Sequence, residues 1–288
     1  MITETLSTTT LLTNTSIAEL AVSAVRAEAD LTPKPGLVDQ RGSGAHTDMD
    51  LAMLHASAES LRASFAECAL ATTQSVLGPE LRARLGEIGR AGERAMLEAT
   101  GGVNTHRGAL WALGLLSAGA AVGGGLAGAV GVAARLAAIP DRHPAATITA
   151  SHGALARLRH GVCGAIGEAQ EGFPHIRLHA LPTLRAAQRS GADEGTARLE
   201  ALLSLMATLD DTCVLHRGGR AGLRALQAGA QAVLDAGGFG TPEGRRRFTA
   251  LDEVCLTQRL SPGGSGDLLS ATVFLDTLDR GAAQPCRP

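Results

Sequence analysis

The feature that most constrains the fold is a stretch of 27 consecutive residues without a charged side chain, from Gly108 to Ala134. Such a stretch exceeds the roughly 18 apolar residues that predict a membrane-spanning helix. Eight of its residues are glycine, however, and the three at 123–125 stand in a row, which should interrupt a continuous helix. We therefore expect two buried helices within a soluble helical bundle and no membrane span.

Composition favours an all-α protein with one domain. Aromatic residues make up only 2% of the 288 residues and tyrosine is absent, whereas alanine, leucine and glycine are abundant, which suits closely packed helices better than a β-sandwich. The 45% of hydrophobic residues is enough to bury a large core. No sustained alternation of period two and no internal repeat is present. We expect one multi-helix catalytic domain over 16–280, with flexible ends at 1–15 and 281–288.

Capping residues and apolar spacing mark the individual helices. Ser16 and Glu19 have the spacing of a capping box, and Thr47 with Asp50 could cap the next helix in the same way. Asn104 or Thr105 would cap the helix that begins the uncharged stretch. The further expected helices run from 79 to about 100, from 144 toward 172, and over 196–209, 221–236 and 242–258, with a last helix after 267.

Charge and cysteine usage exclude several classes of function. The formal net charge is −2 with a pI near 6.5, so the chain has no overall basic field for nucleic acid or an anionic membrane. Its five cysteines form no C-x-x-C pair, which argues against a zinc site and a disulfide scaffold and favours free thiols in a reducing cytosol. The N-terminus lacks the basic segment of a secretory signal. We expect a cytoplasmic protein.

Four polar, glycine-containing loops lie at expected helix ends, over 32–50, 102–108, 210–219 and 261–267. Helix N-termini present unpaired amides and a partial positive charge, so the second and fourth loops could cradle phosphate groups. Lys34, Arg41, Arg107 and Arg217 could add positive charge. Glycine turns before helices also occur in proteins that bind nothing, so a purely structural role stays open for each loop.

The acidic residues and histidines leave several roles open. Adjacent Asp210 and Asp211 suit a hard cation such as Mg²⁺, which usually takes one or two carboxylates together with water and phosphate oxygens. Asp48 and Asp50 could join a metal site at a helix start, or Asp50 could simply complete a cap. Glu168 could be an auxiliary acid or a surface residue. His46, His106 and His216 lie in the polar loops, whereas four other histidines have no special context and are expected to be structural or exposed: His55, His143, His175 and His179. The residues alone indicate an all-α enzyme that acts on a phosphorylated small molecule.

An ordered set of motifs resembles one known family. The segments 31–39 (LTPKPGLVD) and 44–50 (GAHTDMD) are similar to the signature of triphosphoribosyl-dephospho-coenzyme A synthases. Further similar segments follow in order, within a resemblance that runs from about 17 to 276: 102–108 (GVNTHRG), 161–174 (GVCGAIGEAQEGFP), 210–212 (DDT), 217–219 (RGG) and 261–269 (SPGGSGDLL). Three positions depart from the pattern. Arg107 replaces an expected lysine, Gly266 an alanine, and Cys213 a polar residue.

The resemblance implies transfer of the 5-triphosphoribosyl group of ATP to the 2′-hydroxyl of 3′-dephospho-coenzyme A, with release of adenine. The product would be the prosthetic-group precursor for the acyl carrier subunit of malonate decarboxylase, with citrate lyase as the alternative pathway. Because the N-glycosidic bond of ATP breaks, the site must stabilise an oxocarbenium-like ribose, assist adenine as it leaves and deprotonate the incoming hydroxyl.

Charge and expected position at helix ends, together with the resemblance, divide the candidate residues into three groups. Mg²⁺ would be held by Asp210 and Asp211, with Asp48 as a further ligand. The base would be one of Asp39, Asp50, Glu168 and Asp267, which the sequence does not rank. Phosphate and substrate contacts would come from Lys34, His46, Asn104, His106, Arg107, Arg217, Gly263, Gly264 and Ser265.

Two other functions stay open at this point. A metal-dependent ADP-ribosyl hydrolase is also helical, cleaves N-ribosides and uses a DDT segment like 210–212, although its other motifs are not evident. A non-enzymic binding module for nucleotides or an acyl carrier protein would fit if the carboxylates were dispensable. The segment 108–134 could also pack between subunits of a homo-oligomer.

Overall fold

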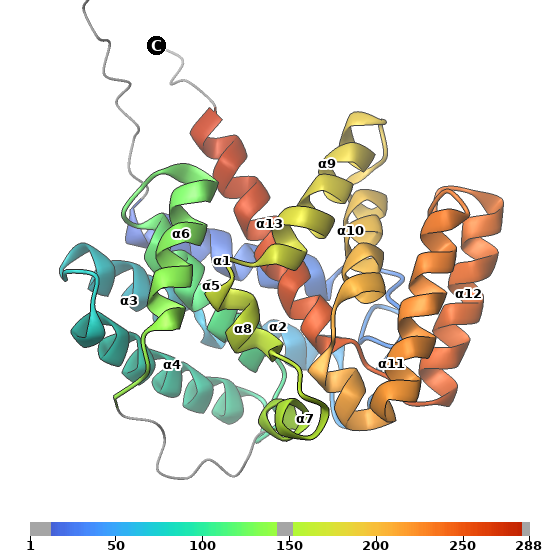
Figure 1. Ribbon diagram of the computed structural model, residues 1–288, viewed down its shortest axis with the longest axis horizontal. Helices are drawn as coiled ribbons and strands as arrows, with labels where there is room; N and C mark the ends of the chain where they lie inside the picture. The colour runs from blue at the N-terminus through green and yellow to red at the C-terminus, as the bar shows by residue number, and fades with distance from the viewer. Residues whose placement is uncertain (1–12, 143–151, 284–288) are drawn as a thin grey trace, which may run out of the picture.

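The structure is a computed structural model that describes residues 13–142 and 152–283 (Figure 1). The described residues form helices and no strand, apart from one isolated bridge between Asp39 and Gly42, so the expected all-α class is confirmed. The helices are α1 (Asn14–Ala29), α2 (Leu51–Ser60), α3 (Arg62–Thr73), α4 (Pro79–Ala99), α5 (Arg107–Ala120), α6 (Gly125–Ala138), α7 (His152–His160), α8 (Gly164–Gln170), the π-helix η1 (Ile176–Ala180), α9 (Leu181–Arg189), α10 (Glu194–Thr208), α11 (Thr212–Asp235), α12 (Pro242–Thr257) and α13 (Gly263–Ala283).

Helix α13 is the centre of the arrangement and runs through the middle of the molecule in Figure 1. It packs against α1, α5 and α10, and its apolar residues, such as Phe274 and Leu275, are fully buried. Helices α11 and α12 pack as a pair at one side, while α3 and α4 lie at the opposite side. The N-terminal turn of α13 is therefore enclosed by elements from both ends of the chain.

The uncharged stretch forms two helices, as the glycine triplet predicted. Helices α5 and α6 separate at Gly123–Gly125, where all three glycines have positive φ. Helix α5 packs against α3, α6 and α13 of the same chain. Among the described residues no single helix is long and apolar enough to cross a membrane; α5 and α6 reach the required length only as a pair bent by 119°.

Several helix boundaries differ from the sequence expectation. Helix α1 begins at Asn14 and is capped by Thr13 instead of Ser16. Helix α2 begins at Leu51, with Asp50 itself as the cap, so the expected start at Thr47 is wrong. In both cases a residue with a suitable side-chain oxygen lies within three positions of the expected cap, and the tertiary path of the chain decides which one is used.

The largest differences concern polar segments expected to be loops. Helix α11 begins at Thr212 and continues through a break at Gly219 (φ 59°), so most of the 210–219 segment is helical. Likewise, Gly263 begins α13, which makes the 263–267 segment its first turn. The helix expected between 144 and 172 consists of α7 and α8, separated at Gly161. Helices η1 and α9 have no counterpart in the expectation.

The chain ends were expected to be flexible over 1–15 and 281–288. Residues 1–12 and 284–288, and the beginning of the helix expected from 144, lie outside the described residues. Within the described part, residues 14–15 and 281–283 belong to helices α1 and α13.

Candidate active site

One buried carboxylate, Asp211, joins the N-terminal ends of α11 and α13. Its Oδ1 atom accepts hydrogen bonds from the amides of Cys213 and Val214 at 2.9 and 3.4 Å and so caps α11. Its Oδ2 atom accepts hydrogen bonds from the amide and the hydroxyl of Ser265 at 2.8 and 3.0 Å, in the first turn of α13. Burial raises the pKa of Asp211, and the four hydrogen bonds oppose that rise. Asp211 therefore fixes the relative position of two helix ends.

A second carboxyl group, Asp267, joins the first turn of α13 to the N-terminal end of α5. The Asp267 Oδ1 atom accepts a hydrogen bond from the amide of Ala109 at 2.8 Å. Its Oδ2 atom lies over Gly108, where an added Cβ would be only 2.0 Å away. Burial, and next the negative charge of Glu28, raise the pKa of Asp267 well above its ordinary value. Both effects favour the protonated form of the carboxyl group over the carboxylate.

The two glycines at the start of α13 allow α11 and α13 to approach closely. A Cβ added at Gly264 would lie 3.1 Å from the Asp211 Oδ2 atom, and one added at Gly263 would lie 3.2 Å from the Cys213 Sγ atom. Together with the contact between Asp267 and Ala109, this approach brings the N-terminal ends of three helices to one place. Converging helix N-termini favour anions through their unpaired amides and partial positive charge.

Lys34 and Glu28 of α1 form a buried ion pair next to this region. The Lys34 Nζ atom donates hydrogen bonds to the Glu28 carboxylate at 2.8 Å and to the carbonyls of Glu28 and Ala29 at 2.6 and 3.3 Å. Lys34 is only 1% exposed. Because an ammonium group has three protons, no proton remains for a phosphate group in this arrangement. Glu28 was not among the candidates because an acid near a helix end carries no distinctive sequence signal.

Asp39 holds the shape of the loop between α1 and α2. Its carboxylate accepts hydrogen bonds from the Lys34 amide at 2.8 Å and from the amide and Nε atom of Arg41 at 2.8 and 2.9 Å. Arg41 also donates to Asp252 of α12 at 2.6 Å, and Asp252 accepts the Gly36 amide at 3.1 Å. These bonds tie the loop to α12, so Asp39 and Arg41 have structural partners for their charges.

His46 connects the same loop to α11 and to the segment before α13. Arg217 donates to the His46 Nδ1 atom at 3.1 Å and to the Ala45 carbonyl at 3.3 Å. The other ring nitrogen, Nε2, lies 2.7 Å from the Ser261 hydroxyl and is assigned as the protonated nitrogen from this network. Burial, and next the charge of Arg217, lower the pKa of His46. His46 and Arg217 thus form a polar rim beside the helix ends.

His106 lies buried directly ahead of α5, with one ring nitrogen in use. Its Nδ1 atom lies 2.8 Å from the Ser57 hydroxyl, which in turn accepts a hydrogen bond from Thr105 at 2.6 Å. Ser57 therefore donates to Nδ1, and the proton of His106 is on Nε2, a buried atom without a hydrogen-bond partner in the described part of the chain. Burial lowers the pKa of His106 to about 4, so the ring is neutral.

Glu168 binds His175, a residue that the sequence analysis set aside as structural or exposed. The Glu168 Oε2 atom lies 2.6 Å from the His175 Nδ1 atom, and Oε1 accepts the His175 amide at 3.0 Å. The turn between them contains Phe173 with φ 55°, an unusual conformation for a bulky residue. The hydrogen bond that His175 donates to Glu168 raises the pKa of His175. A turn separates the two residues, so helical periodicity does not predict their contact, which is why the sequence did not reveal the pair.

The side chains of three other candidates take no part in the contacts among the helix ends described above. Asn104 is exposed. Arg107 forms an ion pair with Glu93 of α4, and Asp50 caps α2 by accepting the Met53 amide at 2.8 Å. Neither Asn104 nor Thr105 caps α5; the Asp267 carboxyl group does so from α13.

The three proposed metal ligands do not converge. Over residues 13–142 and 152–283, no group of three or more His, Cys, Asp or Glu side chains is arranged to hold a metal ion. Asp48 is exposed and lies 3.5 Å from His46, while Asp210 is exposed at the start of α11. Both oxygens of Asp211 already accept two hydrogen bonds each. The donor set of Asp48, Asp210 and Asp211 therefore does not fit a resident Mg²⁺.

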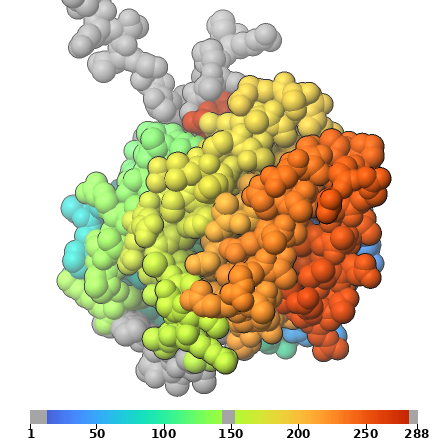
Figure 2. All heavy atoms as spheres, turned by 45° about the vertical axis from the view of Figure 1, so that its right-hand side comes forward, coloured from blue at the N-terminus to red at the C-terminus, as the bar shows by residue number. Residues whose placement is uncertain are grey.

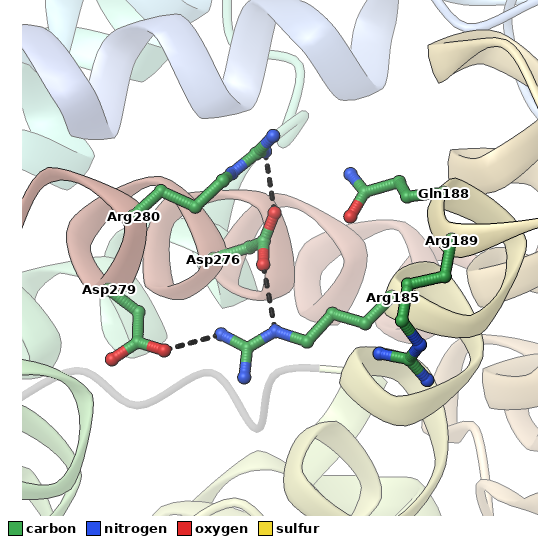
Figure 3. A pocket seen from close by; sticks show the side chains of 6 residues that line it. All are labelled: Arg185, Gln188, Arg189, Asp276, Asp279 and Arg280. Atoms are coloured by element: carbon green, nitrogen blue, oxygen red, sulfur yellow. Dashed lines mark hydrogen bonds and ion pairs between the residues drawn. The ribbon is translucent and has the colours of Figure 1, made fainter. Parts of the chain in front are cut away.

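A surface hollow of about 370 Å³ lies elsewhere, between α9 and the C-terminal half of α13 (Figure 3). Figure 3 shows Arg185 between two acidic side chains, with hydrogen bonds of 3.0 Å to Asp276 and 2.7 Å to Asp279. Arg280 also pairs with Asp276 at 2.5 Å. Because Arg185 and Arg280 pair with Asp276 and Asp279 in this way, these four residues have a structural explanation as a clamp between α9 and α13.

The region around Asp267 combines features that the hollow lacks. It has a half-buried carboxyl group whose raised pKa has no arginine beside it, among the described residues, to oppose the rise, and it lies next to helix ends that favour anions. Such a region can hold an anionic group and transfer a proton next to it.

Comparison with known proteins gives a consistent result. Residues 14–285 match the model of a family described as ATP:dephospho-CoA triphosphoribosyl transferase. A protein of Stutzerimonas stutzeri (strain A1501) is 54% identical over 93% of both chains, and one of Pseudomonas fluorescens (strain Pf-5) is 54% identical over 93% of this chain and 92% of its own. Each bears the name "Probable 2-(5″-triphosphoribosyl)-3′-dephosphocoenzyme-A synthase". No solved structure matches.

Proposed function

The chain belongs to the ATP:dephospho-CoA triphosphoribosyl transferase family and is therefore an enzyme, a triphosphoribosyl-dephospho-CoA synthase; we propose that its reaction takes place where α5, α11 and α13 meet. The bond between the ribose C1′ atom of ATP and adenine N9 breaks, and a bond forms between C1′ and the 2′-hydroxyl oxygen of 3′-dephospho-coenzyme A. The acceptor hydroxyl loses one proton in this reaction, and the leaving adenine gains one. The substrates are ATP and 3′-dephospho-coenzyme A.

Asp267 is the acid–base group that the geometry favours among the four candidates. Asp39 is engaged with Arg41, Asp50 caps an exposed helix, and Glu168 binds His175. Asp267 combines a raised pKa with a position in the first turn of α13, beside the converging helix ends. In its protonated form it would donate to adenine as the glycosidic bond breaks, and as a carboxylate it would then accept the hydroxyl proton. The position of this carboxyl group, in the first turn of α13 and within hydrogen-bond distance of the Ala109 amide of α5, is the observation that supports the assignment.

The triphosphate group would bind at the helix ends and the polar rim. Arg217 is exposed and charged, and it is positioned by His46 and the Ala45 carbonyl. The glycines at 263 and 264 allow α11 and α13 to approach closely, so that the N-terminal ends of both helices could face the same phosphate group. Lys34 contributes differently from the sequence expectation, since it neutralises Glu28 below the site.

Magnesium belongs to this proposal as a companion of ATP. Mg²⁺ takes most of its ligands from phosphate oxygens and water in such sites, and when bound it would neutralise charge on the triphosphate. Asp210, the exposed carboxylate next to the α11 cap, is the protein ligand that we propose. Since the set of three carboxylates does not assemble, no step assigned to Asp267 depends on a metal.

The product would serve the acyl carrier subunit of malonate decarboxylase, with citrate lyase as the alternative. The same compound is the precursor in both pathways, so the genes beside the coding gene provide the test: malonate decarboxylase subunits would support the proposal, and citrate lyase subunits would contradict it. Because ATP is a cytoplasmic metabolite, we also propose a cytoplasmic location. A homo-oligomer remains a separate proposal, which light scattering of the purified protein would test.

Adenine release tests the proposed reaction directly. The enzyme is incubated with ATP and Mg²⁺, with or without 3′-dephospho-coenzyme A, and adenine is separated by chromatography. We expect adenine only when the acceptor is present, in equal amount to the new coenzyme derivative. Adenine formed equally well without the acceptor would indicate a hydrolase, and no adenine under either condition would contradict the proposal.

A further inference from the structure

Helices α7 and α11 together carry an unusual concentration of positive charge. These arginines are Arg157 and Arg159 of α7 and Arg220 and Arg224 of α11, and we name them the α7–α11 basic surface. Arg217 of α11 belongs instead to the polar rim beside His46. No acidic residue occurs in α7 or in α11 before Asp235. The whole chain has a formal net charge of −2, so this surface differs in sign from the protein as a whole.

The two helices form one continuous surface that begins at the candidate active site. Arg220 donates a hydrogen bond to the His160 carbonyl at the end of α7. A Cβ added at Gly153, near the start of α7, would lie 3.5 Å from the hydroxyl of Thr212, which directly follows Asp211. Figure 2 shows the yellow-green α7 beside the orange segment of α11 on one face of the molecule. The surface therefore extends from the α11 cap along the outside of α11.

The positive charges of this surface are not neutralised within the described residues. None of its four arginines forms an ion pair with an acidic side chain there, whereas Arg41 and Arg185 each pair with two. Moreover, the Arg157 Nε atom is buried and has no hydrogen-bond partner in the described part of the chain. Arginines that are close together and unpaired repel one another, and an anionic ligand removes that repulsion.

Apolar side chains accompany the arginines on α7. Leu155 and Leu158 are 46% and 83% exposed and stand three positions apart, so the helix presents two neighbouring apolar side chains to solvent. A free nucleotide offers phosphate groups but no flexible apolar arm. A ligand that carries both would use the arginines and the leucines at the same time.

We propose that the α7–α11 basic surface binds the acceptor substrate, with the diphosphate of 3′-dephospho-coenzyme A on its arginines and the pantetheine arm along Leu155 and Leu158. This inference rests on the proposed function and adds the location of its second substrate. ATP and the acceptor then reach Asp267 from different directions: ATP lies over the helix ends, and the acceptor lies along α11.

A charge-reversal variant tests this location. Arg159 and Arg224 are exposed, and neither contacts Asp211, Asp267 or His46 in the structure. We expect Arg159→Glu combined with Arg224→Glu to raise the KM for 3′-dephospho-coenzyme A about tenfold or more, because two charge-assisted phosphate contacts are replaced by repulsion. The KM for ATP and the kcat at saturating acceptor should change less than about twofold.

The matched control reverses two exposed arginines away from this surface, Arg189→Glu on α9 and Arg246→Glu on α12. This control changes the net charge equally and should leave the KM for both substrates unchanged; thermal unfolding of both variants checks folding. The inference alone would be contradicted if the wild type is active and the first variant leaves the KM for the acceptor unchanged. An equal change of this KM in the control would contradict it as well. Absence of acceptor-dependent adenine release in the wild type would instead contradict the proposed function on which it rests.

Discussion

The two ends of α13 both carry buried acidic groups, yet they differ in how the charges are balanced. At the C-terminal end, Asp276 is 1% exposed and lies between Arg185 and Arg280, while Asp279 also binds Arg185. At the N-terminal end, Asp211 and Asp267 are held mainly by backbone amides. The one lysine nearby, Lys34, is bound by Glu28. One end is thus an ion-pair clamp, and the other retains carboxyl groups without a matching cation.

This difference shows why the hollow in Figure 3 is a poor guide to the active site. The hollow is the more open feature, but both of its acidic groups are paired with arginines. At the N-terminal end, burial raises the pKa of Asp267 and lowers the pKa of His106, and acid–base chemistry uses perturbations of this kind. We therefore expect the residues at the N-terminal end of α13 to take part in catalysis. The residues at its C-terminal end should contribute to the stability of the fold.

The largest effect should come from comparing Asp267→Asn with Asp279→Asn. Asparagine at 267 keeps an oxygen for the Ala109 amide but loses the acid, so adenine release should fall by about 100-fold or more. Asparagine at 279 removes one partner of Arg185 and should leave kcat within about twofold of the wild type. Both are measured by adenine chromatography at saturating substrates. Equal loss in both variants would remove the distinction between the two ends.

Acid sensitivity should arise at the N-terminal end through His106. Because folding lowers the pKa of His106 to about 4, the unfolded chain binds more protons below its ordinary value of about 6.5. The contribution of His106 to the free energy of unfolding is fully present above pH 6.5. It declines as the pH falls toward 4, by up to about 3 kcal/mol. Urea unfolding of wild type and His106→Gln at pH 7 and pH 4.5 measures it. The decline should be smaller in the variant, and an identical decline in both would count against a buried neutral histidine.

At the C-terminal end, Asp276→Asn should lower stability and leave catalysis per folded molecule unchanged. The variant leaves the guanidinium groups of Arg185 and Arg280 without their shared buried partner. Since both arginines are partly exposed, we expect a loss of about 2 kcal/mol in the free energy of unfolding, less than for a fully buried pair. Denaturant titration provides the value, and adenine release at a temperature where the protein is folded provides the control. A loss of turnover in the folded variant would contradict the division of roles.

The smallest effect should come from the rim of the N-terminal end. Arg217→Ala removes one exposed cation and its contacts with His46 and Ala45, so the KM for ATP should rise about fivefold, an effect that weakens at high salt. Steady-state kinetics at low and high ionic strength measure the change. Arg246→Ala on α12 serves as the control with the same change in charge. An unchanged KM for ATP would remove Arg217 from the triphosphate site.

The sequence predicted the architecture well where local patterns decide it. The glycine triplet at 123–125 separated α5 from α6, and Pro79 and Pro242 marked the starts of α4 and α12. It was less informative where tertiary contacts decide, because Gly263 begins a helix only when Asp211 satisfies the Ser265 amide from another helix. Partners such as Glu28 for Lys34 and His175 for Glu168 also depend on packing, and neither spacing carries a motif.

Hydrogen exchange with and without ATP tests the central claim most directly. In the absence of the acceptor, ATP should protect the amides of 107–109, 212–214 and 263–267 at the three converging helix ends, and leave those of 185–189 and 276–281 around the hollow unchanged. Mass spectrometry of peptides from these segments gives the comparison in one experiment. Protection of the segments around the hollow, with none at the helix ends, would contradict the account.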